Sequence, residues 1–65
     1  MTPTERHAVD MVVGRLQRKY SNLPADTVTG VVESIHRKFR NVKARDLIPP
    51  LVEQFSGREL SRRVG

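Results

Sequence analysis

Cysteine and tryptophan are absent from this 65-residue chain, which contains only one Tyr and two Phe. Without cysteine, neither a disulfide nor a thiolate metal site can form, and the composition fits a reducing compartment. The two histidines, His7 and His36, lie far apart in the sequence, so no metal site is predicted. Domains this small usually need a disulfide, a metal or a partner chain for stability. By elimination, we expect self-association or docking onto another domain.

Long apolar runs are also missing, and none approaches the ~18 residues of a membrane span. Residues 1–10 include acidic side chains and lack the apolar segment of a secretory signal. We therefore expect a cytoplasmic protein that does not contact a membrane.

The residue combinations that catalysis requires are not evident. Glu33 and Glu53 are single carboxylates on separate predicted helices, and Ser34 and Ser56 have no evident base. A domain this small is also predicted to lack room for a ligand cavity of several hundred Å³. The sequence thus predicts no enzyme, no catalytic or metal-binding residue and no cofactor.

Two segments, at about residues 3–21 and 24–40, have apolar residues at the three- and four-residue spacing of one buried helix face. We expect the first helix to be capped by Thr2, with Pro3 in its first turn and Glu5 as the acid of a capping box. The first apolar stripe consists of Val9, Val12, Val13, Leu16 and Tyr20. The second consists of Val28, Val31, Val32, Ile35 and Phe39.

A third helix is predicted at about residues 44–62, and the pair Pro49-Pro50 lies near its start. Neither proline can donate a backbone hydrogen bond, and Pro50 disfavours an α conformation at Pro49. We expect a first turn at 44–48, a kink or 3₁₀ step at the prolines, and regular helix beyond them. No segment alternates with a period of two, so no strand is expected. The predicted fold is a single all-α domain over residues 1–65, a three-helix bundle whose third helix is kinked near its start.

The apolar stripe of the third helix is unusually wide, at roughly 140° compared with about 100° for a normal buried face. One interpretation is that the prolines rotate the two halves of the stripe, so that all of it faces one core. The other is that the excess apolar surface packs against a second copy of the chain, which the small-domain argument favours. The candidate dimer-interface residues are Leu47, Ile48, Leu51, Val52 and Phe55.

Positive charge dominates, with twelve Lys and Arg against seven Asp and Glu and a net charge of +5. A basic run without an acid forms the end of the second helix and the following corner. It consists of Arg37, Lys38, Arg40, Lys43 and Arg45. These cations could contact the phosphates of a nucleic acid, or they could simply be solvated and favoured near a helix C-terminus. A helix-turn-helix reader needs polar residues on its recognition helix, whereas 47–55 is mostly apolar.

Individual side chains near this corner have narrower predicted roles. His36 lies at the margin of the second stripe, where we expect its ring to pack and its tip to form a hydrogen bond. Arg45 could form an ion pair across a dimer interface. Met11 lies opposite the first stripe and is expected to be exposed.

Most of the chain, at about 5–62, resembles the actinobacterial three-helix bundle dimerisation domain. The resemblance is carried by the segments 28–32, 35–39 and 42–53, and most specifically by the run from Arg45-Asp46 to Val52-Glu53. The chain departs from the family pattern at Leu47, where an aromatic residue is common, at Pro50, and at 55–57, where the family is usually charged and alanine-rich. The family occurs as short stand-alone proteins and as the N-terminal extension of phosphatase-like arsenate reductases. The resemblance implies dimerisation through the bundle, no activity in this chain, and a phosphatase-like protein as one candidate partner.

These observations favour a non-catalytic interaction module that forms a homodimer, mainly through its third helix. The alternative is a small basic nucleic-acid-binding protein that uses the run from Arg37 to Arg45.

Overall fold

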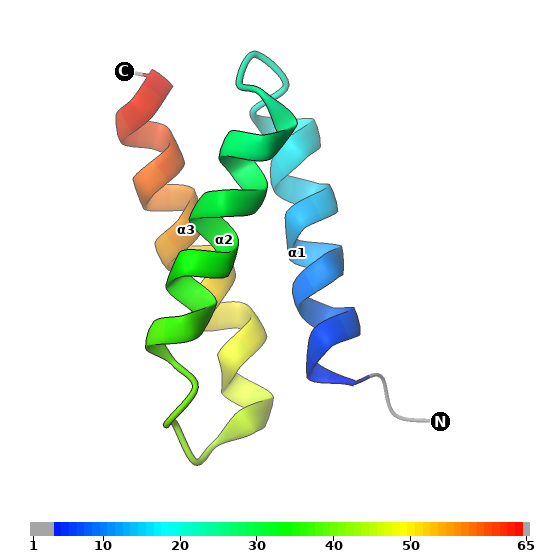
Figure 1. Ribbon diagram of the computed structural model, residues 1–65, viewed down its shortest axis with the longest axis vertical. Coiled ribbons are helices and arrows are strands. Elements are labelled where there is room, and N and C mark those ends of the chain that lie inside the picture. The colour runs from blue at the N-terminus through cyan, green and yellow to red at the C-terminus, as the bar shows by residue number, and fades with distance from the viewer. Residues whose placement is uncertain (1–3, 65) are drawn as a thin grey trace.

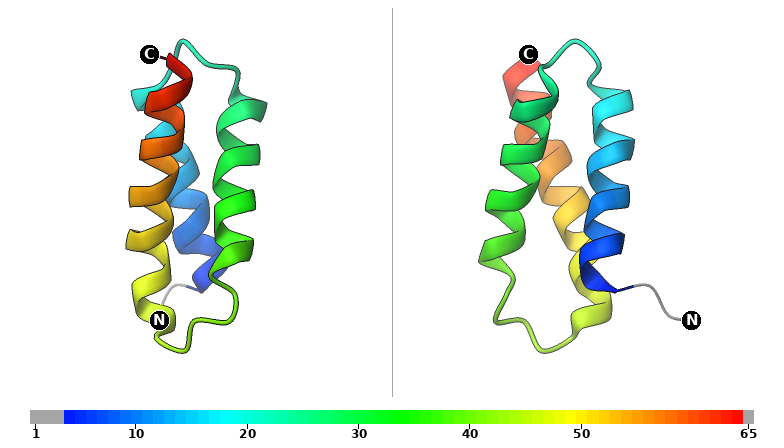
Figure 2. Two further views of the ribbon diagram at one scale, coloured as in Figure 1. Left: turned by 90° about the vertical axis from the view of Figure 1, so that its left-hand side faces the viewer. Right: turned by 45° about the vertical axis from the view of Figure 1, so that its right-hand side comes forward.

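The computed structural model describes residues 4–64, which form three α-helices and one 3₁₀ turn (Figure 1). The elements are α1 (Glu5–Lys19), α2 (Ala25–Lys38), η1 (Arg45–Leu47) and α3 (Ile48–Val64). Successive helices are antiparallel, and each helix packs against the other two (Figures 1 and 2). The predicted all-α three-helix bundle is confirmed, and no strand occurs in residues 4–64. None of the helices in this range is long and apolar enough to cross a membrane.

The first helix begins two residues later than predicted. Thr4 is its N-cap, and the Thr4 hydroxyl accepts a hydrogen bond from the backbone N–H of His7 at 3.1 Å. This bond satisfies one of the N–H groups that have no acceptor within the first turn of a helix. The predicted cap at Thr2 was therefore wrong, and Thr2 and Pro3 themselves lie outside the described residues.

The core lies along the common axis of the three helices, and the first two apolar stripes supply most of it. The predicted stripes place their central residues there, while Val13, Tyr20 and Phe39 are only partly buried against it. α3 supplies one residue from each successive turn, at four-residue spacing. The buried apolar residues are Val9, Val12, Leu16, Val28, Val31, Val32, Ile35, Ile48, Val52 and Leu60.

The double proline lies in the first turn of α3. The kink or 3₁₀ step predicted at the prolines was wrong in its position: the 3₁₀ turn η1 ends at Leu47, and Pro49 and Pro50 lie in regular α-helix. Ile48 adopts α dihedrals (φ −63°, ψ −48°), although a following proline disfavours them. The missing N–H groups of the prolines are not needed there, because the first N–H groups of a helix have no acceptor within it. α3 therefore continues unbroken, through Gly57, to Val64.

Ser56 is the one buried polar side chain among residues 4–64, with an exposed fraction of 0%. Its hydroxyl has no hydrogen-bond partner among these residues. Ser56 occupies the turn of α3 between Val52 and Leu60, a position that an apolar residue would normally fill. The serine thus places an unsatisfied hydroxyl in the core, which lowers the free energy of unfolding.

Candidate interaction surfaces

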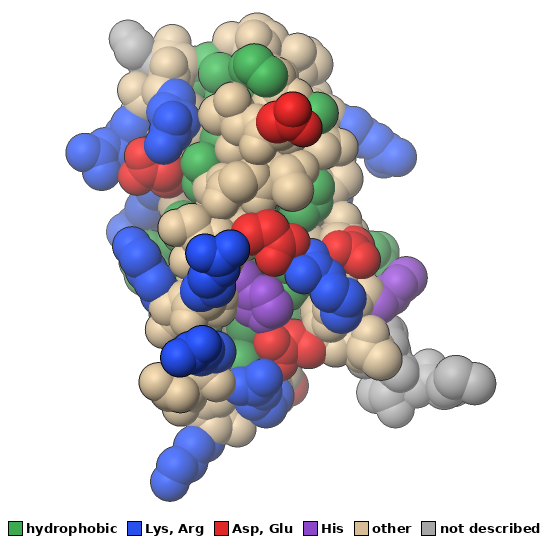
Figure 3. All heavy atoms as spheres, in the orientation of Figure 1, with side chains coloured by type: hydrophobic (Ala, Val, Ile, Leu, Met, Phe, Trp, Pro, Cys, Tyr) green, Lys and Arg blue, Asp and Glu red, His purple; other side chains and the backbone are tan. Residues whose placement is uncertain are grey.

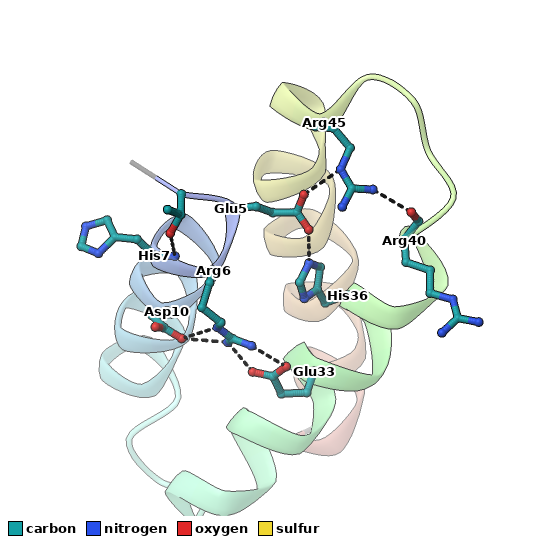
Figure 4. Close-up of polar contacts among 9 residues, drawn as sticks. Glu5, Arg6, His7, Asp10, Glu33, His36, Arg40 and Arg45 are labelled. Atoms are coloured by element: carbon teal, nitrogen blue, oxygen red, sulfur yellow. Dashed lines mark hydrogen bonds and ion pairs between the residues drawn. The ribbon is translucent and has the colours of Figure 1, made fainter. Parts of the chain in front are cut away.

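The seam between α1 and α2 is closed by charged side chains (Figure 4). Glu5 receives a hydrogen bond from Nε2 of His36 at 2.6 Å, and its second oxygen lies 2.9 Å from Nε of Arg45. The next residue of α1, Arg6, donates to Asp10 at 3.1 Å and to Glu33 of α2 at 3.0 Å. The first helix is thereby linked both to the second helix and to the turn that precedes the third.

The seam between α1 and α3 is closed in a similar way. Arg15 binds Glu53 through two parallel hydrogen bonds of 3.0 and 2.6 Å, the two-point geometry that suits a guanidinium and a carboxylate. Nearer the other end, the Tyr20 hydroxyl donates to the backbone carbonyl of Gly57 at 3.2 Å. Both contacts join the same pair of helices, so α1 is linked by polar bonds to each of its neighbours.

The seam between α2 and α3 differs from the other two, because no hydrogen bond or ion pair joins these helices within residues 4–64. Its most prominent contact is aromatic: the rings of Phe39 and Phe55 lie 5.5 Å apart between centroids and are tilted by 41°. Arg58 lies over the outer side of the Phe55 ring, 5.8 Å from its centroid. Apolar packing alone holds this seam together.

The candidate dimer-interface residues separate into two groups. Ile48 and Val52 have exposed fractions of 0% and belong to the core of the single chain, so neither can contact a partner while the bundle is folded. Leu47 and Phe55 are 52% and 41% exposed, and Leu51 between them is partly buried. These three residues follow each other at four-residue spacing along one side of η1 and α3. We call Leu47, Leu51 and Phe55 the apolar strip.

The candidate anion-binding residues also fall into two groups. Arg45 donates to the backbone carbonyl of Arg40 at 2.6 Å and pairs with Glu5, both within the chain. The intrachain contact with Glu5 replaces the pair across a dimer interface that the sequence suggested for Arg45. The remaining four cations of the run are exposed, and no acidic partner for them occurs in residues 4–64. They are Arg37, Lys38, Arg40 and Lys43. In Figure 3, which has the orientation of Figure 1, Lys and Arg side chains lie along the left edge and the lower part of the molecule.

The predictions for His36 and Met11 are confirmed. The His36 side chain is 19% exposed, and its ring nitrogen donates to Glu5. Met11 is 51% exposed on α1. Within residues 4–64, no three His, Asp or Glu side chains form a group that could hold a metal ion.

Ligand-sized volume is present, contrary to the prediction from chain length, but it takes the form of open surface grooves. One depression, of about 810 Å³, lies between α1 and α3 and is bordered by the Arg15–Glu53 pair. Two more, of about 460 and 490 Å³, lie along the seam between α2 and α3. These grooves could not be predicted from the sequence, because they depend on how the helices are spaced.

The hydrogen bond from His36, aided by the charge of Arg45, lowers the pKa of Glu5 below its usual value. The ionised carboxylate is therefore favoured in the folded chain, and its contribution to stability is present above the pKa of the unfolded chain, about 4.3. That contribution is lost as the pH falls through the lower, folded-state pKa. The hydrogen bond from Arg6 lowers the pKa of Glu33 in the same direction.

The variant Glu5→Gln should accordingly be less stable than the wild type at pH 7, by up to about 1 kcal/mol. The difference should shrink as the pH falls below about 4, because Glu5 of the unfolded chain then binds a proton while the folded-state carboxylate, with its lower pKa, does so only at still lower pH. Urea unfolding at pH 7 and pH 3.5 measures both values. The control is Glu59→Gln, which removes only exposed contacts of 3.8 and 3.5 Å with Arg62 and Arg63. If Glu5→Gln lost the same free energy of unfolding at both pH values, the lowered pKa assigned to Glu5 would be contradicted.

Comparisons with protein-family models, with curated proteins and with solved structures give no match for this chain. The resemblance to the actinobacterial dimerisation domain thus stays a prediction that rests on the residues quoted for it.

Proposed function

We propose that this chain is a non-catalytic protein-interaction module that forms a homodimer through the apolar strip. The observation that carries the proposal is the position of Leu47 in η1 and Phe55 in α3, two large apolar side chains that are about half exposed on one side of these two elements. Large apolar residues grouped in this way are typical of association surfaces. The lack of cysteine supports a cytoplasmic setting as part of the same proposal.

Further support comes from the size of the bundle. A domain of 65 residues buries about 60% of the surface of its unfolded chain. Pairing two copies would remove the apolar strip from water and add the stability that so small a core lacks. The surface proposed here is smaller than the one expected from sequence, since Ile48 and Val52 belong to the core.

Sedimentation equilibrium over a concentration series tests the proposal directly. We expect a species of about twice 7.4 kDa that persists at high salt, since apolar contacts carry the interface. Each copy has a net charge of +5, so added salt should screen the mutual repulsion and tighten the dimer. A folded monomer at every concentration and salt level would remove self-association as the function.

Nucleic-acid binding is the second candidate, and the observation that favours it is the set of four exposed cations without an acidic partner. It makes the opposite salt prediction, because phosphate contacts release counterions and weaken steeply as salt rises. Titration of a labelled single- or double-stranded oligonucleotide into the same salt series separates the two functions. Binding that falls with salt and is lost when Arg37, Lys38 and Arg40 are replaced would support this candidate.

A further inference from the structure

The seam between α2 and α3 carries a continuous groove that the proposed dimer does not account for. Its two depressions share Ile35, Lys38 and Glu59, so they adjoin end to end. The left panel of Figure 2 looks directly onto this seam. The groove runs beside α2 from Asp26 to Phe39, which corresponds to about 20 Å of helix. We call it the α2–α3 groove.

The shape of the groove suits a helical ligand. On the α2 side its upper wall is formed by the small residues Thr27, Gly30 and Ser34. A Cβ atom built on Gly30 meets nothing within 4 Å, so the space above this wall is open. The lower part is lined by Ile35, Phe39 and Phe55, which provide apolar surface. A helix of about 13 residues would span the groove, with its apolar side against this lining.

The charges around the groove determine which kind of helix fits. Lys38, Arg58 and Arg62 surround the apolar lower part, where Glu59 is the only acid in the lining. The upper part is lined by one further acid, Asp26, and one further cation, Arg63, so the excess of positive charge lies in the lower part. Glu59 already lies 3.5 Å from Arg63 and 3.8 Å from Arg62, so it offers little to a basic ligand. Lys38 and Arg58 have no acidic partner within residues 4–64. A ligand with carboxylates beside its apolar residues would satisfy these cations.

A second copy of this chain matches the groove poorly. Each copy carries a net charge of +5, and the last turns of both α1 and α3 are basic. Like charges brought together across an interface disfavour the pairing. The occupant is therefore expected to differ from the chain itself, and to be acidic where the groove is basic.

We propose that the α2–α3 groove binds an acidic amphipathic helix of another protein, with apolar residues at i, i+3 or i+4, and i+7 flanked by Asp or Glu. This inference does not depend on self-association. The two surfaces have only Phe55 in common, and Gly30 lies at the upper part of the groove, apart from the apolar strip. In a dimer that pairs through the strip, Phe55 would contact the other copy, and the part of each groove around Gly30 would lie away from that contact.

The test uses two leucine substitutions at helical glycines. Gly30→Leu fills the upper groove, while Gly14→Leu is the matched control on α1. Both glycines have open space where a Cβ would lie, and neither has a positive φ. Leucine also favours helix more than glycine does, so both variants should fold. Circular dichroism confirms folding before any binding is measured.

The probe is a displayed library of helical peptides of about 14 residues, with acidic, neutral and basic residues allowed at every variable position. It is selected in parallel on the wild-type chain and on the two variants. We expect acidic amphipathic sequences to be enriched on the wild type and on Gly14→Leu, but not on Gly30→Leu. For an enriched peptide, fluorescence anisotropy should give a Kd that rises at least about tenfold in Gly30→Leu and stays within about twofold in Gly14→Leu.

Three results would overturn the proposal: no enrichment on the wild type, enrichment of neutral or basic sequences, or equal binding by Gly30→Leu. Sedimentation of the same three proteins keeps this test separate from self-association. A monomeric wild type that selects acidic helices would remove the dimer and leave the groove assignment intact. A dimeric wild type that selects no acidic helix would support self-association and contradict the groove assignment.

Discussion

A chain carrying Val52→Asp should be unfolded at room temperature. Val52 has an exposed fraction of 0% and packs in the core, so an aspartate there would be buried without a partner. Changes of this kind rank among the most destabilising single substitutions, at about 4–5 kcal/mol or more. A core this small rarely supplies more than about 3–5 kcal/mol in total. The far-ultraviolet circular dichroism spectrum should therefore lose its helical signal.

Gln54→Asp is the matched control for this variant, because it places the same residue two positions later on the exposed side of α3. It should retain the helical spectrum and a cooperative melting transition. A Val52→Asp chain that also retained both would show that Val52 lies outside the core. The expected unfolding also means that Val52 cannot be used to test dimerisation, since loss of the dimer would only report loss of the fold.

The double variant Leu47→Ser, Phe55→Ser should convert the dimer to a folded monomer. Both side chains are about half exposed in the single chain, so the variant should still fold, although Phe55→Ser also removes the ring contact with Phe39. Circular dichroism checks that it does. Each would contribute about 1–2 kcal/mol to an apolar interface. A dimer of the variant lacks four such side chains, two from each copy, so the dissociation constant should rise by about 1,000-fold or more. Sedimentation equilibrium across the concentration series measures this change.

The single variant Met11→Ser controls for the loss of exposed apolar surface in general. Met11 is 51% exposed, as much as Leu47, but it lies on α1. It should leave the dissociation constant within about twofold of the wild type. The interface would have to lie elsewhere on the bundle if Met11→Ser raised the dissociation constant as much as the double variant did. The same would follow if the double variant left the dimer unchanged.

The first two helices could be predicted from sequence because their apolar residues recur on one face, and burial of that face determines the packing. Val12 and Val32 are fully buried for this reason. The third helix was harder to interpret. Its buried line includes Ser56, which is polar, and Leu60, which lies beyond the predicted stripe, while Phe55 within the stripe is 41% exposed. An apolar pattern cannot identify a buried serine or decide which edge of a wide stripe faces the core.

The partners in the polar links between helices could not be predicted, since these links join residues remote from each other in sequence. Glu5 and His36 are 31 positions apart, and Arg15 and Glu53 are 38 apart. The contact of each pair depends on the rotation of two helices about their axes, which hydrophobic periodicity defines only roughly. For the same reason, the basic run looked uniform in sequence, although Arg45 is bound within the chain.

The odd number of helices has a geometric consequence for anything attached to this bundle. α1 begins at one pole and α3 ends at the other (Figure 1), and the longest extent of the bundle is 34 Å. In a dimer whose long axes are parallel, two cargo domains joined after Val64 would lie side by side at one pole. In an antiparallel dimer, they would be held apart at opposite poles by roughly the length of the bundle. Whether two copies pair in parallel or antiparallel would thus determine the distance between any domains joined to them.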